Sequence, residues 1–407
     1  MKIFYLITKS EEGGAQTHVA QLVGYFTGKG HEVAVMSYPG GWLEGEVKKA
    51  GAVFFPNPYF ANSYNPLRSL KAILEIGIAV RNFKPDLVHC HSSIAGFLGR
   101  LAVRNKVPTI FTAHGWGFND YVGPVSRFAA AAAEKMAAYY TAKIICVSEF
   151  TKNLALKHKI APAGKFVVVH NGIEKFALSE IALRNQAARS LQNGKIPEKF
   201  YAPQEFLTGY TPEKKAKVAG EKLKIVFVGR FAEPKEPEIL VRAYTSLDES
   251  VKNKAELLIV GEGPKREALL KLIAADTGGA IKLLGRLSRS EVLKILAEAD
   301  ISVLASKWES FGLSALEAMS ASVPVVVSRV GGLPELVDES CGILVEKSDE
   351  KGMKEALEKL IQNRELRKKL GETARLRAEI MFSLDKMLAK TEEVYRAILK
   401  DKSYVTC

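Results

Sequence analysis

Two series of short apolar runs, separated by segments with helical periodicity, are the feature that most restricts the fold of this chain. Continuous runs rich in valine and isoleucine are typical of parallel strands buried on both faces of a sheet. Strands that alternate with helices predict a doubly wound α/β domain. Because the series occurs twice, we expect two Rossmann-like doubly wound domains that face each other across a cleft. The runs are KIFYLIT, HEVAVMSY, DLVHCHS, PTIFTAH, KIICVSE and KFVVVHNG, then LKIVFVGR, AELLIVGEG, AIKLLGR, ISVLAS, VPVVVS and GILVE.

A lysine-rich stretch without a strand pattern separates the two series. We predict an N-terminal Rossmann-like domain at residues 1–173 and a linker with a helical insertion at residues 174–222. The C-terminal Rossmann-like domain is expected at residues 223–380. A charged helix at residues 381–407 is expected to pack back on the N-terminal domain. The length of 407 residues is sufficient for two such domains.

The net charge of +13 is concentrated in the first part of the chain, where residues 1–170 hold 19 Lys and Arg against 10 Asp and Glu. The basic residues are dispersed and no nucleic-acid-reading motif occurs, so a nucleic-acid partner is not expected. Two interpretations stay open, ordinary solvated charge and attraction to an anionic membrane surface. An aromatic group could either touch that surface or belong to the core. It consists of Trp42, Phe54, Phe55, Tyr59 and Phe60.

No apolar run approaches the roughly 18 residues of a membrane-spanning helix. The N-terminus lacks the apolar core and cleavage site of a signal peptide. Four scattered cysteines without metal-ligand spacing indicate structural thiols in a reducing compartment. We therefore expect a cytoplasmic protein, peripheral at the inner face of the cell membrane. The cysteines are Cys90, Cys146, Cys341 and Cys407.

Ligands of doubly wound domains bind outside the carboxyl ends of the strands, so the residues that follow each strand are the candidate site. After the first strand, Gly13 and Gly14 open a helix whose free N–H groups can face an anion. His114 follows FTA and is flanked by glycines, where it can hydrogen-bond a ligand hydroxyl or donate to a leaving oxygen. Weaker candidates of the same kind are His89, His91, Ser148, Glu149, His170 and Asn171.

The second series supplies cations at its strand ends. Gly229 ends a strand, Arg230 follows it, and Lys235 lies in the next loop. Two cations at one strand exit suit an anion such as a diphosphate, which arginine can bind with two nitrogens and lysine as a point charge. Gly261 and Gly263 end the next strand. Arg286 follows a further strand, and this edge is expected to hold a nucleobase through backbone groups.

The stretch KWESFGLSALEAMSAS places two glutamates eight positions apart around a predicted helix start. The residues Phe311, Gly312 and Leu313 lie at the N-terminus of that helix, so their N–H groups can face phosphate or sugar oxygens. Glu317, one turn into the helix, could accept hydrogen bonds from a diol such as a ribose. Glu309, in the loop before, could accept from sugar hydroxyls. Neither glutamate has a second metal ligand nearby, so no metal site is expected there.

In this order, the motifs GGA, FTAHGWGF, VSE, HNGI, VGRF, VGEGP, LLGR, ESFGLSALE and SRVGGLPELV resemble those of the glycosyltransferase family 4 enzymes. These are nucleotide-sugar transferases of the GT-B fold, and the resemblance covers nearly the whole chain. ESFGLSALE matches the E-x₇-E motif of the family. The FTAHGWGF segment resembles the branch that builds capsular polysaccharides and exopolysaccharides on a lipid carrier.

The resemblance implies a role for each matching residue. Arg230 and Lys235 would bind the diphosphate of the donor and stabilise it as it leaves. Glu317 would take the ribose, Glu309 would contact the transferred sugar, and His114 would bind that sugar near the reacting centre. The backbone at Gly14 and at residues 311–313 would lie beside the donor. The family needs no metal or other cofactor and retains the anomeric configuration.

Two departures from the family pattern occur. The family has glycine after the lysine, whereas this chain reads Pro234-Lys235-Glu236, and the linker at residues 174–222 is longer than usual.

From the resemblance we expect a retaining hexosyl- or N-acetylhexosaminyltransferase that moves a sugar from a UDP-sugar to a lipid-linked acceptor in cell-surface polysaccharide synthesis. A UDP-sugar epimerase and a non-catalytic nucleotide-sugar-binding protein stay open as alternatives. A nicotinamide oxidoreductase is the least expected class, because no strand is followed by its glycine spacing.

Overall fold

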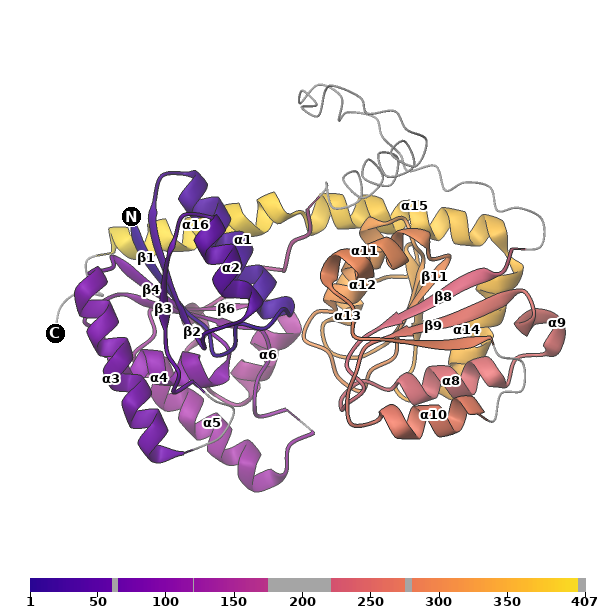
Figure 1. Cartoon of the computed structure of the whole chain (residues 1–407), viewed down its shortest axis with the longest axis horizontal. Coiled ribbons are helices and arrows are strands. Elements are labelled where there is room, and N and C mark those ends of the chain that lie inside the picture. The colour runs from indigo at the N-terminus through magenta and orange to yellow at the C-terminus, as the bar shows by residue number, and fades with distance from the viewer. Residues whose placement is uncertain (61–64, 120, 175–220, 275–279, 402–407) are drawn as a thin grey trace, which may run out of the picture. The chain divides into compact units, whose positions relative to one another are not determined.

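The computed structural model describes residues 1–60, 65–119, 121–174, 221–274 and 280–401. Two compact units make up the chain. Unit 1 comprises Met1–Gly172 together with Asp385–Cys407, and unit 2 comprises Ile173–Leu384 (Figure 1). The predicted linker with its helical insertion lies almost entirely outside the described residues, as does Cys407.

Unit 1 is built on a seven-stranded parallel sheet with the strand order β3-β2-β1-β4-β5-β6-β7 (Figure 1). Strands β4 and β5 consist of buried residues throughout, as does β1 after Lys2, as expected for a sheet covered on both faces. The strands are β1 (Lys2–Leu6), β2 (Glu32–Ser37), β3 (Val53–Pro56), β4 (Leu87–His91), β5 (Thr109–Ala113), β6 (Lys143–Cys146) and β7 (Phe166–Val168). The helices are α1 (Gly14–Gly28), α2 (Trp42–Lys49), α3 (Pro66–Phe83), α4 (Ser93–Val103), α5 (Pro124–Tyr139), α6 (Glu149–Lys157) and α16 (Leu384–Lys400).

Unit 2 repeats this architecture with a six-stranded parallel sheet in the order β10-β9-β8-β11-β12-β13. All six strands predicted in the second series are present. They are β8 (Leu223–Val228), β9 (Ala255–Val260), β10 (Ile281–Gly285), β11 (Ile301–Leu304), β12 (Val325–Ser328) and β13 (Gly342–Val345). The helices are α8 (Pro237–Thr245), α9 (Glu249–Lys252), α10 (Arg266–Ala274), α11 (Arg289–Glu298), α12 (Leu313–Ser320), α13 (Leu333–Leu336), α14 (Glu350–Gln362) and α15 (Arg364–Met381). The expected pair of doubly wound α/β domains is confirmed.

Local sequence explains where several helices begin. The Asn65 side chain accepts a hydrogen bond from the Arg68 N–H at the start of α3, and Pro66 takes the first position, where its missing N–H costs nothing. Ser288 and Glu291 form a capping box at the start of α11. Ser148, a weak site candidate from the sequence, accepts from the Thr151 N–H and caps α6.

Helix α16 packs on unit 1 through buried polar groups as well as apolar contacts. The Tyr395 hydroxyl donates to the Tyr5 hydroxyl at 3.2 Å and bonds His89 Nδ1 at 2.5 Å. Glu392 accepts from the Tyr25 hydroxyl at 2.7 Å and from Lys29 Nζ at 2.6 Å. These hydrogen bonds lower the pKa of Glu392 to about 2. The last helix therefore belongs to the N-terminal unit, although the chain reaches it only after completing the second sheet.

The aromatic group considered for a membrane contact lies mostly inside the domain. Phe54 and Phe55 belong to β3, an edge strand that the sequence analysis did not predict. Phe60 is 2% exposed, and Phe55 and Tyr59 pack against the core of unit 1. The core interpretation is therefore the correct one for these three side chains. Among the described residues, no helix combines the length and apolar character needed to cross a membrane.

A buried ion pair connects α4 to α5. Arg100 is fully buried, and its Nη2 donates to Glu134 Oε2 at 2.7 Å. The Arg100 Nε donates to the Gly96 carbonyl at 2.8 Å, and the guanidinium lies 4.0 Å from the centroid of the Phe111 ring. Removing one partner of such a pair leaves an uncompensated charge in the core.

We predict that Glu134→Ala lowers the free energy of unfolding by about 3–5 kcal/mol, because the Arg100 guanidinium stays buried without its counter-charge. Urea-induced unfolding followed by circular dichroism measures this loss. The control is Glu46→Ala, which removes a surface pair with the exposed Lys49 and should cost less than about 1 kcal/mol. Equal losses for the two variants would show that the buried pair stabilises the fold no more than the surface pair does.

Candidate active site

The candidate site of unit 2 lies where the strand order of its sheet reverses. From β8 the chain proceeds to β9 and β10 on one side, and β11 then pairs with β8 on the other side. The loops after β8 and β11 are joined by hydrogen bonds. The Glu236 N–H donates to the Ala305 carbonyl at 3.1 Å, and the Lys307 N–H donates to the Pro234 carbonyl at 2.8 Å. Such a switch point is where open α/β sheets bind ligands.

The lysine and the first glutamate predicted from the sequence meet at this point. Lys235 Nζ pairs with Glu309 Oε2, and both side chains are 17% exposed. The Lys235 ammonium has three N–H donors, so it can hold Glu309 and still offer hydrogen to a phosphate oxygen. Arg230 follows β8 on the same edge and is exposed to solvent. Gly229, before it, is the residue that ends the strand.

The second glutamate lies on α12, whose start requires a glycine. Gly312 caps the helix with φ +101°, a left-handed conformation that favours glycine. A Cβ at Gly312 would also lie 2.5 Å from Leu333. Leu313 opens the helix, as predicted, while the Phe311 side chain is buried against Phe382. The contribution of Phe311 to a ligand site is therefore limited to its backbone.

Glu317 is paired with an arginine that the sequence analysis did not select. Arg289 Nη2 lies 3.2 Å from Glu317 Oε1, and the glutamate side chain is 12% exposed. Arg289 opens α11, which contacts α12. Arg286, the predicted residue, follows β10 and is exposed. Arg289 lies three positions after Arg286, so the predicted arginine marks this region but is not the residue that pairs with Glu317.

Three glycines bring backbone segments into close contact around the site. A Cβ at Gly261 would lie 1.9 Å from the Gly229 carbonyl oxygen, and a Cβ at Gly263 would lie 2.5 Å from the Phe231 carbonyl oxygen. Gly331 has φ +57°, and its Cβ would lie 1.8 Å from the Glu309 carbonyl oxygen. Only glycine allows these approaches, so the loops after β8, β9, β11 and β12 form one surface.

The residue after Lys235, where the family has glycine, is a buried glutamate. Glu236 has φ −121°, which any residue can adopt, so the turn needs no glycine here. Its carboxylate accepts from the Ser348 hydroxyl at 2.8 Å and 3.0 Å. The side chain is thus satisfied inside unit 2, and Lys235 keeps its place beside Glu309.

Further cations surround this surface. Lys265 Nζ lies 2.6 Å from Glu238 Oε1, 3.0 Å from Glu233 Oε1 and 3.1 Å from the Lys235 carbonyl oxygen. Lys307 Nζ lies 3.2 Å from Glu233 Oε1. Neither lysine was predicted from the sequence, because each is an ordinary loop lysine until the fold brings the loops together.

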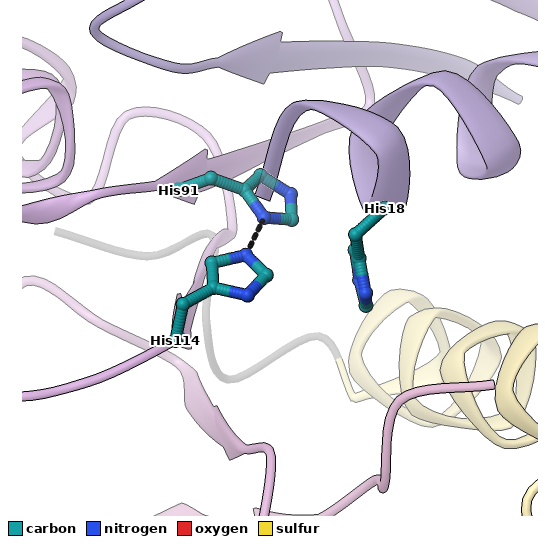
Figure 2. A group of neighbouring side chains, drawn as sticks. All are labelled: His18, His91 and His114. Carbon is teal, nitrogen blue, oxygen red and sulfur yellow. Dashed lines mark hydrogen bonds between the residues drawn. The ribbon is translucent and has the colours of Figure 1, made fainter. Parts of the chain in front are cut away.

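Unit 1 has its own switch point, between β1 and β4, and histidines gather there. His114 follows β5, His91 ends β4, and His18 lies in the second turn of α1 (Figure 2). His91 Nδ1 and His114 Nε2 are 3.1 Å apart, and the His18 and His114 ring centroids are 5.0 Å apart. His18 was not predicted, because it lies within α1 and no sequence motif relates it to His91 or His114.

These imidazoles are neutral at ordinary pH. Burial lowers the pKa of His18 to about 4 and lowers the pKa of His91 and His114 well below the usual 6.5. The His18 Nδ1–H donates to the Asn171 carboxamide oxygen at 3.0 Å. His89, next to the group, is bonded through both ring nitrogens, to Tyr395 and to Thr112. Neutral imidazoles can donate hydrogen bonds to sugar hydroxyls or accept from them.

The glycine pair after β1 is placed as predicted. Gly13 caps α1 in an extended conformation and Gly14 is its first residue, exposed to solvent. The N–H groups at this helix start therefore lie on the same edge of the sheet as His91 and His114. The histidine group and the glycine pair together make up the candidate site of unit 1.

Two protein families match the chain. Residues 12–175 match the family described as Glycosyltransferase Family 4, and residues 211–377 match the family described as Glycosyl transferases group 1. Together these ranges cover more than half of the chain, and each contains one of the two candidate sites.

Curated relatives match over most of their length. An uncharacterized glycosyltransferase of Methanocaldococcus jannaschii is 29% identical over 77% of this chain and 76% of its own length. The UDP-Gal:alpha-D-GlcNAc-diphosphoundecaprenol alpha-1,3-galactosyltransferase of Escherichia coli is 27% identical over 72% of this chain and 70% of its own length. The capsular polysaccharide biosynthesis glycosyltransferase CapM of Staphylococcus aureus is 25% identical over 82% of each chain.

Solved structures agree on the fold. Anabaena HepE, in complex with UDP and glucose, superposes with a TM-score of 0.76 over 98% of this chain and 100% of that chain, at 17% identity. At this identity the likeness concerns the fold. The chain therefore belongs to the glycosyltransferases of the GT-B fold, with a family 4 N-terminal part and a group 1 C-terminal part.

Proposed function

We propose that this glycosyltransferase moves a sugar from a UDP-sugar to a lipid-linked acceptor in cell-surface polysaccharide synthesis, with retention of the anomeric configuration. The observation that carries the proposal is the pair of glutamates around α12, each held by a cation at the switch point of the second sheet. The relatives support the donor and acceptor classes, because one acts on UDP-Gal and a diphosphoundecaprenol-linked sugar and another makes capsular polysaccharide.

The chemical task at this site is to stabilise a leaving diphosphate. As the bond between the sugar and the phosphate breaks, negative charge develops on the phosphate oxygens. Lys235 and Arg230 supply positive charge, and the N–H groups at the start of α12 supply donors, without a metal ion. The acceptor hydroxyl attacks from the face that the diphosphate leaves. Its proton passes to a departing phosphate oxygen. Because attack and departure occur on the same face of the sugar, retention needs no covalent sugar–enzyme intermediate.

The remaining predicted residues hold the donor in place. Glu317 accepts hydrogen bonds from the ribose hydroxyls, with Arg289 fixing the carboxylate. Glu309 accepts from the hydroxyls of the transferred sugar while it positions Lys235. His114, neutral and only partly buried, binds a hydroxyl of that sugar as donor or acceptor. Positioning of this kind is the second large contribution to transferase catalysis.

We predict that Lys235→Ala lowers kcat by on the order of 10²–10³, the usual loss when one donor to a developing anion is removed. The measurement is transfer of labelled sugar from a UDP-sugar to GlcNAc-diphosphoundecaprenol, with UDP-galactose, UDP-glucose and UDP-GlcNAc tested in turn. Lys282→Ala is the matched control, because Lys282 pairs with Glu256 away from the site. Wild-type turnover in Lys235→Ala would refute the leaving-group role.

Donor specificity and the two alternatives are settled by a second pair of measurements. A thermal-shift panel of UDP-sugars should show selective stabilisation, about 2.7 kcal/mol at a hundred times the dissociation constant. Product analysis without acceptor should show no isomeric UDP-sugar, whereas an epimerase would produce one. Stabilisation by a UDP-sugar with no transfer to any lipid-linked acceptor would favour a non-catalytic binding protein.

We further propose that unit 1 docks on an anionic membrane through α3 and α5. Helix α3 has two apolar sides. Ala72, Ile76 and Ala79 face the core, whereas a second stripe with helical spacing is between 44% and 73% exposed. A surface helix of a globular domain normally has one apolar stripe. The exposed stripe consists of Leu67, Leu70, Leu74 and Ile78.

Helix α5 repeats this pattern, and basic residues accompany both stripes. Its exposed apolar side chains are between 49% and 83% exposed. An apolar face with lysine and arginine beside it is typical of helices that lie in the surface of an anionic membrane. The apolar residues of α5 are Val125, Phe128, Met136 and Tyr139. The basic residues on the two helices are Arg68, Lys71, Arg81, Arg127 and Lys135.

We predict that the double variant Leu70→Ser, Leu74→Ser loses more than about tenfold in partitioning onto phosphatidylglycerol vesicles. Each leucine side chain contributes up to about 1.5–3 kcal/mol when it leaves water, and about 1.4 kcal/mol is tenfold. Co-sedimentation at low salt measures the partitioning, and high salt should weaken it. The control Leu270→Ser, Leu376→Ser removes two exposed leucines from unit 2. No wild-type binding at low salt would end the proposal.

A further inference from the structure

The histidine group of unit 1 has the geometry of a metal-binding site. His18, His91 and His114 each offer one ring nitrogen, and these three atoms lie within 4.8 Å of one another (Figure 2). The closest pair, His91 Nδ1 and His114 Nε2, is 3.1 Å apart. Two nitrogens on one tetrahedral Zn²⁺ are roughly 3.3 Å apart, since Zn–N bonds are about 2.0–2.1 Å. Two of the three ligands therefore already lie at coordination distance.

A neutral imidazole binds a metal ion through the ring nitrogen that carries no proton. His18 is oriented for this role. Its Nδ1–H donates to Asn171, which leaves Nε2 as the free lone pair. Metal-bound histidines almost always donate their other N–H to such a partner.

One ring nitrogen of the group is unsatisfied. His91 is fully buried, and its Nε2 has no hydrogen-bond partner among the described residues. This nitrogen carries the ring proton when Nδ1 binds the ion, and a buried polar atom of this kind points to a water as its hydrogen-bond partner. His114 is only partly buried, so the group is open to solvent on one side. An ion can enter there and keep one coordination position for water.

We propose that His18, His91 and His114 form a binding site for a borderline transition-metal ion of the Zn²⁺ class. Nitrogen ligands without carboxylate or thiolate favour such ions over Mg²⁺ or Ca²⁺, which need oxygen ligands. Bound metal takes the lone pair of His114 Nε2, so the ring keeps only its Nδ1–H for the sugar and can no longer accept a hydrogen bond. This second step rests on the proposed function, in which His114 binds the donor sugar. The ion therefore acts as an antagonist of donor binding, and no step of sugar transfer passes through it.

Metal binding is tested on the full chain, purified without a histidine tag and without any substrate. Titration with Zn²⁺ in a calorimeter, and with Co²⁺ followed by its visible absorption, should show one site per chain with the spectrum of tetrahedral cobalt. His18→Gln and His114→Gln should each weaken binding by more than tenfold. Asn171→Ala should weaken it by about 10–100-fold, as the loss of an outer partner does.

The controls are His31→Gln and His158→Gln, because both histidines lie outside the group and should leave Zn²⁺ binding unchanged. Circular dichroism verifies that every variant is folded. Absence of Zn²⁺ binding by the wild type, or equal binding by the wild type and both folded ligand variants, would overturn the site. Antagonism is tested separately, by titrating the best UDP-sugar with and without one equivalent of Zn²⁺. An unchanged affinity would refute the antagonism, whatever the catalytic role of His114.

Discussion

Both sheets depend on one topological constraint, the reversal of strand order beside their first strand. Crossover connections leave β1 and β8 in one direction and return to β4 and β11 on the other side. At that point the helices on the two faces diverge, so the loops at the carboxyl edge are not covered. The strand-end residues considered for function lie at these edges, in the last positions of a strand or in the loops that follow. The chemistry of each unit is therefore decided by which side chains follow a few strands.

The two switch points differ in electrostatic character. In unit 2 the loops carry ion pairs, Lys235 with Glu309 and Arg289 with Glu317, which stay partly exposed. In unit 1 the corresponding edge carries buried imidazoles whose pKa is lowered by desolvation. Paired charges suit an anionic diphosphate, and neutral donors and acceptors suit an uncharged sugar ring. This difference explains why removing a cation and removing a histidine should affect different steps.

The sequence was sufficient to predict most of the strands, because a continuous apolar run of this length between turn residues is typical of a buried strand. It failed at β3, a four-residue edge strand that is half exposed and reads as an aromatic loop. Lys235 and Glu309 could be found because they lie in loops that follow strands, and Glu317 because its spacing from Glu309 forms a motif. Arg289 and His18 could not, because no motif includes them and each meets its partner only through helix packing. Their contacts depend on how α11 packs on α12 and α1 on the sheet.

The membrane stripes and the histidine site are related by the same topology. In a parallel sheet each crossover helix begins at the carboxyl edge and runs back along the strands. The first turns of α3 and α5 therefore lie at the edge that carries His91 and His114. The most exposed apolar side chains of the two helices, Leu67 at 73% and Val125 at 83%, occur in those first turns. A membrane that covers them would hold a lipid-linked acceptor on the side of unit 1 where sugar binding is proposed.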